Sequence, residues 1–355
     1  MEIHQLLPGY QYGDAISNHA AALRTLLRAW GHRSEIFSQH IGPAVEHDCF
    51  RMKDFRGRDG AVTIYHYSIG AAEMTDLFLS APGKRMLVYH NITPHHYFSG
   101  FDEDELQKTK EGRDALADLR ESADMVLADS QFNCDELAAI GFSNPRVLPI
   151  LADFAGFAAA ETCLRTLHRL RDGWTNLLFV GRLAPNKRQD DVIRVFAHYN
   201  KFINRRSRLL LVGSDAKQGY AAQLRGMVRQ LGLEDYVEFS GHVRLPELKA
   251  YYQAADVFIC MSEHEGFCVP FLEAFHHGVP VVAYKAAAVP GTLGGAGILV
   301  GERNFSTVAE LVNLLVTDDK LRTLVIRGQH RRLSNFEPRL VGERFRAYLS
   351  EVIAA

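Results

Sequence analysis

Two acidic residues at a fixed spacing follow a short apolar run in the second half of the chain. Glu265 and Glu273, with seven residues between them, belong to the segment Ser262–Ala274. Pro270 suits the first turn of a helix, because the N–H that it lacks would be unpaired there. We therefore expect Glu265 in a loop and Glu273 about one turn inside the helix. A carboxylate in such a loop can bind sugar hydroxyls, although most glutamates are solvated surface charges.

The backbone between the two glutamates suits an anion. Gly266, Phe267 and Cys268 stand where free N–H groups and the positive end of the helix dipole can meet a phosphate. The pattern predicts a phosphate at the helix end and a sugar beside Glu265.

Two cations follow another apolar run, Asn176–Arg182. Arg182 stands at its end, directly after Gly181, which lets the backbone approach a ligand, and Lys187 comes five residues later. Two positive charges on one loop could neutralise a diphosphate leaving group without a metal ion. A solvated lysine and a salt-bridged arginine are the ordinary alternative for either residue taken singly.

Short β-branched or aromatic runs alternate with amphipathic stretches, which is typical of βαβ units with parallel sheets. With 355 residues, 47% hydrophobic and 23% charged, the chain suits two globular domains. The expected strands of the first half are Ile3–Leu7, Glu35–Ser38, Val62–Ser68, Arg85–His90, Met125–Asp129 and Arg146–Ile150. Those of the second half are Asn176–Arg182, Arg208–Ser214, Val237–His242, Val257–Ser262, Pro280–Tyr284 and Gly297–Val300.

We expect a first domain over residues 1–160 and a second over 161–337, with the linker inside Leu151–Trp174. A final helix over Pro338–Ile353 is expected to pack back on the first domain. Its apolar stripe is predicted to be Leu340, Phe345, Leu349 and Ile353. A cleft between two α/β domains, lined by loops at the strand ends, is the expected place for a ligand.

These motifs resemble the retaining glycosyltransferases of family 4, which have the GT-B fold of two Rossmann-like domains. Gly181, Arg182 and Lys187 are similar to the family's G-R-x-x-x-x-K element, and Glu265 to Glu273 to its E-x7-E motif. The segments Leu211–Ser214, Phe239–Val243 and Gly278–Ala283 also follow in the family's order. The resemblance is dense over residues 176–300 and thin before them.

The resemblance implies a role for each matching position. Arg182 and Lys187 would bind the donor diphosphate, Glu265 the hydroxyls of the transferred sugar, and Glu273 the nucleotide ribose. The backbone of Gly266, Phe267, Cys268 and Val269 would line the phosphate and sugar, and Ser214, His242 and Val243 would lie near the nucleotide.

The first domain offers fewer matches. Gly9 and Gly13 flank a loop before a helix that begins near Asp14, and Gly13 and Asp14 are predicted to approach the diphosphate. The loop lacks the G-x-G-x-x-G pattern of nicotinamide dehydrogenases. His90 resembles the family histidine that faces the donor sugar, although a lone histidine is more often structural. Ser130 is predicted to cap the helix that follows it.

The composition excludes several classes of partner. A net charge of -2 gives no basic field for nucleic acid. Neither a signal peptide nor a run of 18 apolar residues is present, so we expect a cytoplasmic protein. Five scattered cysteines indicate reduced thiols, and we expect neither a metal nor a cofactor. The helix containing Arg24 and Arg28 could lie on an anionic membrane, but packing on its own sheet is the simpler interpretation.

The predicted activity is transfer of a hexose-type sugar, with retained configuration, from a UDP- or GDP-sugar to a glycan or lipid-linked acceptor. A bacterial polysaccharide pathway, at the inner face of the membrane, would suit that acceptor. The candidate catalytic residues are Arg182, Lys187, Glu265 and His90. A sugar-nucleotide epimerase, a glycan phosphorylase or an inactive sugar-nucleotide-binding subunit would share the architecture.

Overall fold

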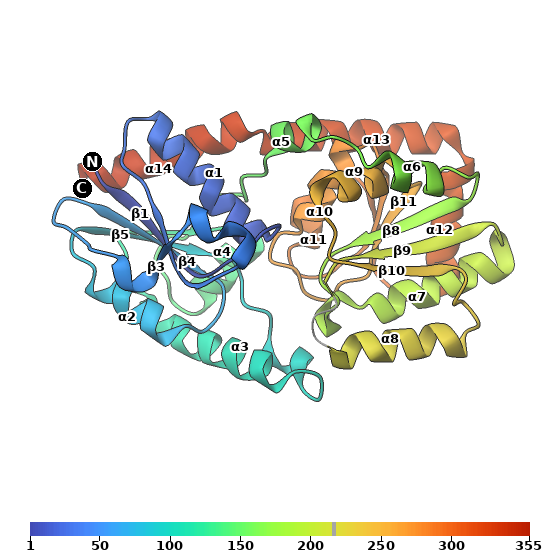
Figure 1. Ribbon diagram of the computed structural model, residues 1–355, viewed down its shortest axis with the longest axis horizontal. Helices are drawn as coiled ribbons and strands as arrows, with labels where there is room; N and C mark the ends of the chain where they lie inside the picture. Colours follow the sequence, from blue (N-terminus) through green and yellow to red (C-terminus); the bar gives the residue numbers. More distant parts are fainter. Residues whose placement is uncertain (215–217) are drawn as a thin grey trace. The chain divides into compact units, whose positions relative to one another are not determined.

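The structure is a computed structural model that describes residues 1–214 and 218–355 (Figure 1). It contains two compact units. Unit 1 comprises Met1–His96, Glu103–Asp153 and Phe336–Ala355, and unit 2 comprises Tyr97–Asp102 and Phe154–Asn335.

Unit 1 is built on a seven-stranded parallel sheet with the strand order β3-β2-β1-β4-β5-β6-β7. The strands are β1 (Ile3–Tyr10), β2 (Ile36–Ile41), β3 (Phe50–Arg51), β4 (Val62–Tyr67), β5 (Lys84–Tyr89), β6 (Met125–Ala128) and β7 (Arg146–Val147). Its helices are α1 (Ala15–Ala29), α2 (Ala72–Ser80), α3 (Glu103–Leu116), α4 (Gln131–Ala139) and α14 (Pro338–Ala354).

Side chains on the two faces of this sheet belong to two separate cores. On β4, Val62 and Ile64 pack with α1 and α14, whereas Tyr65 and Tyr67 pack with α2, α3 and α4. Alternate strand residues point to opposite faces, so a strand buried on both sides is apolar along most of its length. Figure 1 shows α1 and α14 above this sheet and α2 and α3 below it.

Unit 2 has a six-stranded parallel sheet with the order β10-β9-β8-β11-β12-β13. The strands are β8 (Thr175–Val180), β9 (Ser207–Val212), β10 (Val237–Gly241), β11 (Val257–Cys260), β12 (Val281–Tyr284) and β13 (Ile298–Val300). The helices are α5 (Phe154–Ala159), α6 (Leu164–Leu170), α7 (Gln189–His198), α8 (Gln218–Gln230), α9 (Leu245–Ala254), α10 (Val269–His276), α11 (Val289–Leu293), α12 (Phe305–Thr317) and α13 (Asp319–Leu333).

Both faces of the second sheet are covered as well. Val257 and Ile259 of β11 join a core with α7, α8 and α12. Phe258, between them, points to the other face and stacks on Tyr252 of α9, with ring centroids 6.3 Å apart. Each unit is therefore a three-layer α/β sandwich, as the sequence predicts.

The expected strands are all present, and the differences lie at their ends. The two-residue strand β3 was not predicted, because two residues carry no periodic pattern. Gly9 is not in a loop, since β1 continues to Tyr10 and pairs Gly9 with His40.

The last helix belongs to unit 1, but its predicted stripe is partly wrong. Phe345 and Leu349 are buried with Val341 and Val352 against α1 and the sheet, while Leu340 and Ile353 are exposed. Gly342 is also buried on this stripe, where an added Cβ would lie 3.0 Å from the Leu26 side chain of α1.

Candidate functional site

In the sheet of unit 2, the order in which successive strands are added reverses between β8 and β11. Successive strands run outward from β8 through β9 to β10, and then from β11 through β12 to β13 on the other side. Ligands of open parallel sheets bind beyond the carboxyl ends of the strands at such a switch point. The loop after β8 contains Lys187 and the loop after β11 contains Glu265, so the fold brings both predicted loops to this point.

Strand ends beside the switch point approach each other through glycine. Gly213, after β9, has a φ of 150°, and a Cβ on it would lie 2.1 Å from the carbonyl oxygen of Gly181. The amide of Leu183 donates to the carbonyl oxygen of Ser214 over 2.9 Å, which places Ser214 beside the loop that follows β8. A larger residue at position 213 would separate the ends of β8 and β9.

Lys187 and Glu265 form an ion pair at the switch point. The Nζ of Lys187 lies 2.5 Å from Oε2 of Glu265, and the side chain of Glu265 is 6% exposed. Burial opposes protonation of the lysine, but the charges of Glu265 and Cys268 outweigh it and raise the pKa of Lys187. The site therefore holds a fixed positive charge beside a nearly buried carboxylate.

Asn186 joins the two loops. Its side-chain amide donates to the carbonyl oxygen of His264 over 3.1 Å, and its own carbonyl accepts from the amide of Glu263 over 2.9 Å. Asn186 is 3% exposed, so these bonds are shielded from water. No local sequence pattern marks Asn186, because its partners lie about 80 positions away in the chain.

Arg188 was also missed. It adopts a left-handed conformation with φ of 51°, which is uncommon outside glycine. Its guanidinium group lies 2.7 Å from Glu263 and 3.0 Å from both Asp190 and Asp191. These three carboxylates hold the residue next to Lys187 in its uncommon conformation.

Helix α10 begins as predicted, with Pro270 in its first turn. Cys268 is the N-cap, with φ of 74°, and Gly266 and Phe267 precede it, so this backbone lies at the N-terminus of the helix. Glu273 lies inside the helix, where its Oε2 accepts a 2.6 Å hydrogen bond from the hydroxyl of Tyr252. Burial raises the pKa of Glu273, and the bond from Tyr252 opposes this.

The other predicted residues of unit 2 lie at neighbouring strand ends. Arg182 is exposed just after β8, and its carbonyl accepts from the side chain of Gln189 over 3.0 Å. His242 and Val243 follow β10, whose last residue Gly241 accepts from the amide of Gly213 over 3.0 Å. The carboxyl ends of β8, β9 and β10, with the predicted residues that follow them, therefore lie side by side along one edge of the sheet.

In unit 1, Asp14 and Ser17 shape the start of α1. Asp14 is the N-cap, and its Oδ2 accepts from the amide of Ser17 over 2.9 Å and from its hydroxyl over 2.8 Å. Gly13 precedes it with φ of 75°. The position of the Asp14 side chain is therefore explained by its role as the N-cap of α1. Ser130 caps α4 as predicted, accepting from the amide of Asn133 over 3.2 Å.

His90 belongs to a buried polar chain. Its Nδ1 lies 3.0 Å from Oδ2 of Asp129, its Nε2 lies 2.8 Å from Nδ1 of His66, and Nε2 of His66 lies 2.9 Å from Oε1 of Gln5. None of the His90 side chain is exposed. The sequence predicts a ring that faces the donor sugar, but here the ring points into unit 1, because both of its nitrogens bind buried partners.

The folds of the two units, each a parallel sheet covered by helices, define the GT-B class. Anabaena HepE in complex with UDP-glucose has a similar structure, with a TM-score of 0.77 over 99% of this chain and all of that one, at 19% identity. That level of identity supports the fold and nothing further.

Residues 167–331 match the family described as glycosyl transferases group 1. A D-inositol 3-phosphate glycosyltransferase from Kineococcus radiotolerans is 31% identical over 238 residues, which are 61% of this chain and 54% of that protein. O-antigen chain mannosyltransferase B from Escherichia coli is 26% identical over 218 residues, which are 59% of this chain and 56% of that protein. The chain thus spans about half the length of these curated relatives, and the relatives are glycosyltransferases.

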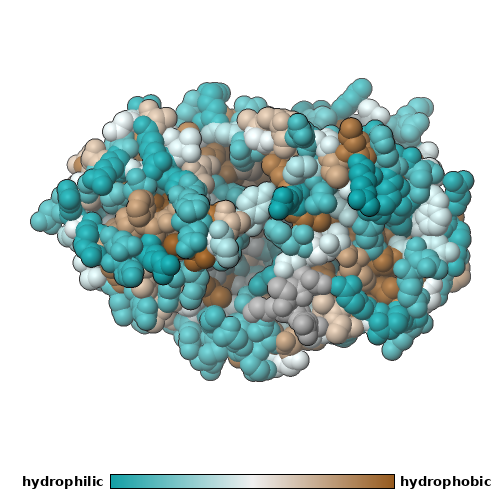
Figure 2. All heavy atoms as spheres, in the orientation of Figure 1, coloured by the Kyte–Doolittle hydropathy of each residue, from teal (hydrophilic) through white to brown (hydrophobic). Residues whose placement is uncertain are grey.

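Two observations bear on a membrane. In the described parts of the chain, no helix is long and apolar enough to cross a bilayer. On α1, Arg24 pairs with Asp48 at 2.6 Å and Arg28 pairs with Glu35 at 2.6 Å, while Leu23 packs in the core. Helix α1 therefore packs on its own sheet. The view in Figure 2 shows a largely hydrophilic surface with apolar residues scattered over it.

Proposed function

We propose that this protein transfers a hexose-type sugar from a UDP- or GDP-sugar to a hydroxyl acceptor, with retention of the anomeric configuration. The observation that carries the proposal is the pair of Lys187 and Glu265 at the switch point of unit 2. The match of residues 167–331 to the group 1 glycosyl transferases supports it, as do relatives named for mannosyl or inositol phosphate glycosyl transfer.

Each group has a role in this proposal. Lys187 and Arg182 stabilise the negative charge that develops on the departing nucleoside diphosphate, which is the main way in which such sites lower a barrier. The amides at the start of α10 add to this stabilisation. Glu265 binds the hydroxyls of the sugar, and Glu273 binds the ribose. Because the His90 ring points inward, the charge stabilisation falls to unit 2.

In the proposed reaction the acceptor hydroxyl attacks the anomeric carbon on the face that the diphosphate leaves. The bond from this carbon to the acceptor oxygen forms as the bond to the phosphate oxygen breaks. The proton of the acceptor hydroxyl passes to that phosphate oxygen. Nothing in this step requires a metal ion, and we propose none for it. The acceptor is proposed to be a glycan or lipid-linked glycan in polysaccharide assembly.

The test is a thermal-shift panel of UDP, GDP, UDP-glucose and GDP-mannose, with ADP as the comparison nucleotide. A ligand present at 100 times its Kd stabilises the folded state by about 2.7 kcal/mol, so the preferred base will raise Tm most. Donor turnover is then followed without acceptor. Slow release of free sugar supports a transferase, whereas epimerisation at C2 indicates the epimerase. No Tm shift with any of the four nucleotides would refute the proposal.

A further inference from the structure

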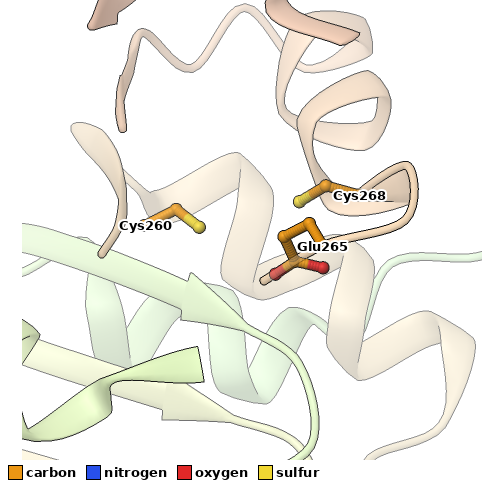
Figure 3. Close-up of side chains that lie close together, drawn as sticks. All are labelled: Cys260, Glu265 and Cys268. Carbon is orange, nitrogen blue, oxygen red and sulfur yellow. The ribbon is translucent and has the colours of Figure 1, made fainter. Parts of the chain in front are cut away.

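Three potential metal ligands meet beside the candidate site. Cys260 ends β11, Cys268 caps α10, and Glu265 lies in the loop between them. Their thiol sulfurs and a carboxylate oxygen all lie within 4.8 Å of one another, and Figure 3 shows the three side chains directed toward a common point. In residues 1–214 and 218–355 they are the one such group of at least three histidine, cysteine or acidic residues.

The loop that brings these ligands together is held by bonds of its own. The amide of Ala288 donates to the carbonyl oxygen of Glu265 over 3.1 Å, and the hydroxyl of Thr292 donates to that of Phe267 over 2.5 Å. Cys268 then turns the chain back through its left-handed conformation. The ligand geometry is therefore set by the fold before any ion arrives, which lowers the cost of binding.

The charges of the cluster call for a divalent cation. Two thiolates and the Glu265 carboxylate carry three negative charges, and the ammonium group of Lys187, 2.5 Å from that carboxylate, cancels one. A divalent ion neutralises the remaining two. Thiolate ligands select soft or borderline ions, of which Zn²⁺ is the commonest in proteins.

The dimensions also suit zinc. With Zn–S bonds of about 2.3 Å and Zn–O bonds of about 2.1 Å, tetrahedral ligands lie roughly 3.5–3.8 Å apart. The side chains need to draw together by about 1 Å at most. To bind the ion, Cys260 gives up its 3.1 Å hydrogen bond to Ser262.

We propose that Cys260, Glu265 and Cys268 bind one thiophilic divalent ion of the Zn²⁺ class, with the fourth position open to water. Both thiols release their protons to solvent as the metal–sulfur bonds form. Binding takes Glu265 away from the sugar, so the ion inhibits transfer; this consequence rests on the proposed function, whereas the binding does not. This proposed metal site also differs from the sequence-based expectation of reduced cysteines without a metal.

Binding is tested on the full-length, reduced and metal-free protein by titration with Co²⁺, which reports on thiolate ligands through its charge-transfer absorption. We expect one ion per chain, displacement by Zn²⁺, and release of two protons per ion in weakly buffered solution. A protein that develops no charge-transfer band, or whose titration gives no defined stoichiometry, would overturn the proposal.

Matched variants locate the site. Cys260→Ser and Cys268→Ser are each expected to weaken Co²⁺ binding by at least about 100-fold, more than the loss of an outer-shell partner usually costs. Cys163→Ser, which changes a partly buried cysteine at the start of α6, is expected to leave the titration unchanged. If the band disappears in the Cys163 variant instead, the ion binds elsewhere and the proposal fails.

Inhibition is measured separately. In wild type, stoichiometric Zn²⁺ is expected to remove the part of the Tm shift by which the preferred nucleotide sugar exceeds its nucleoside diphosphate, and the chelator EDTA to restore it. The Cys260→Ser variant is expected to keep that Tm shift with Zn²⁺ present. If Co²⁺ binds but no nucleotide shifts the Tm, the proposed function is refuted and the metal site stands. If a nucleotide shifts the Tm but Co²⁺ does not bind, the metal site is refuted and the proposed function stands.

Discussion

At the scale of single residues, Lys187 and Arg182 differ in how much the fold depends on them. Lys187 neutralises Glu265, whose side chain is almost wholly buried, whereas Arg182 is exposed after β8. Removing one partner of a buried pair leaves an uncompensated charge. Substituting Lys187 should therefore affect both turnover and stability, whereas substituting Arg182 should affect turnover alone.

We expect Arg182→Ala and Lys187→Ala each to lower turnover by about two to three decades, the usual cost of one transition-state donor. Arg182→Ala should change the free energy of unfolding by no more than about 0.5 kcal/mol, as surface substitutions do. Lys187→Ala, in contrast, should lower the free energy of unfolding as well as turnover, because Glu265 loses its partner. Steady-state kinetics and urea unfolding measure the two effects. Lys320→Ala, an exposed lysine of α13, is the control, and unchanged turnover in both variants would refute the assignment.

Tyr252 acts on the proposed ribose contact through Glu273. Tyr252→Phe removes the 2.6 Å bond to this carboxylate and should cost about 1.5–3 kcal/mol of stability, because the bond is to a charged group. Nucleotide binding should weaken while kcat changes little, since Glu273 is then less well oriented. Tyr251→Phe, the control, removes a comparable 2.5 Å bond to Glu238 at the preceding position of the same helix. Equal loss of nucleotide affinity in both variants would contradict the role of Tyr252.

At the scale of elements, the ends of β8, β9 and β10 set the shape of the site. Gly213 lets the chain after β9 approach Gly181, and this contact keeps the loop after β8 in place. The sheet order then puts β11 on the other side of β8, so the Glu265 loop faces the Lys187 loop.

Gly213→Ala is expected to destabilise the protein by at least about 2 kcal/mol and to weaken nucleotide binding. The added Cβ meets a backbone oxygen at 2.1 Å, and a φ of 150° is unfavourable for alanine. Gly301→Ala, where an added Cβ meets nothing within 4 Å, is the matched control. Chemical unfolding and thermal shift measure both. Wild-type stability of Gly213→Ala would show that the strand ends are not so close.

At the scale of the whole molecule, unit 1 contains buried histidines that the proposed reaction does not use. Gln5 donates its amide to the carbonyl of Ala20, so its oxygen accepts from Nε2 of His66, and Nδ1 of His66 must accept from His90. Burial lowers the pKa of His66 well below 6.5, and the charge of His90 adds to this. Burial does the same for His19, again with a contribution from His90.

These shifts predict that unit 1 loses stability in acid. His19 and His66 stay neutral in the folded chain but take up protons in the unfolded chain below pH 6.5, so their contribution is complete above that pH. Below pH 6.5, each histidine lowers the free energy of unfolding by about 1.4 kcal/mol per pH unit, and the two together by roughly 2.7 kcal/mol per pH unit. The chain has two tryptophans, Trp30 and Trp174. In a Trp174→Phe background, Trp30 fluorescence therefore follows the urea unfolding of unit 1.

His19→Gln and His66→Gln, made in that background, should each reduce the pH slope by about 1.4 kcal/mol per pH unit between pH 6.0 and 5.0. Slopes are compared rather than absolute stabilities, because either substitution also removes a hydrogen bond of its own. Slopes equal to that of the parent in both variants would show that these histidines titrate normally in the folded chain.

The sequence by itself determined the elements and the loops that carry the candidate site. Apolar runs predicted the strands, since a strand covered on both faces is mostly apolar. Pro270 marked the start of α10, because only the first turn of a helix tolerates its missing N–H. Lys187 and Glu265 were predicted one loop at a time, from their positions after strands.

Only the tertiary structure decided which groups meet. Strand order places the loops after β8 and β11 together, and no local pattern encodes that order. Asn186 and Tyr252 were missed because their partners are distant in the chain. The same folding turns the His90 ring inward and brings Cys260 to Cys268, since burial and contact depend on what the rest of the chain packs against each residue.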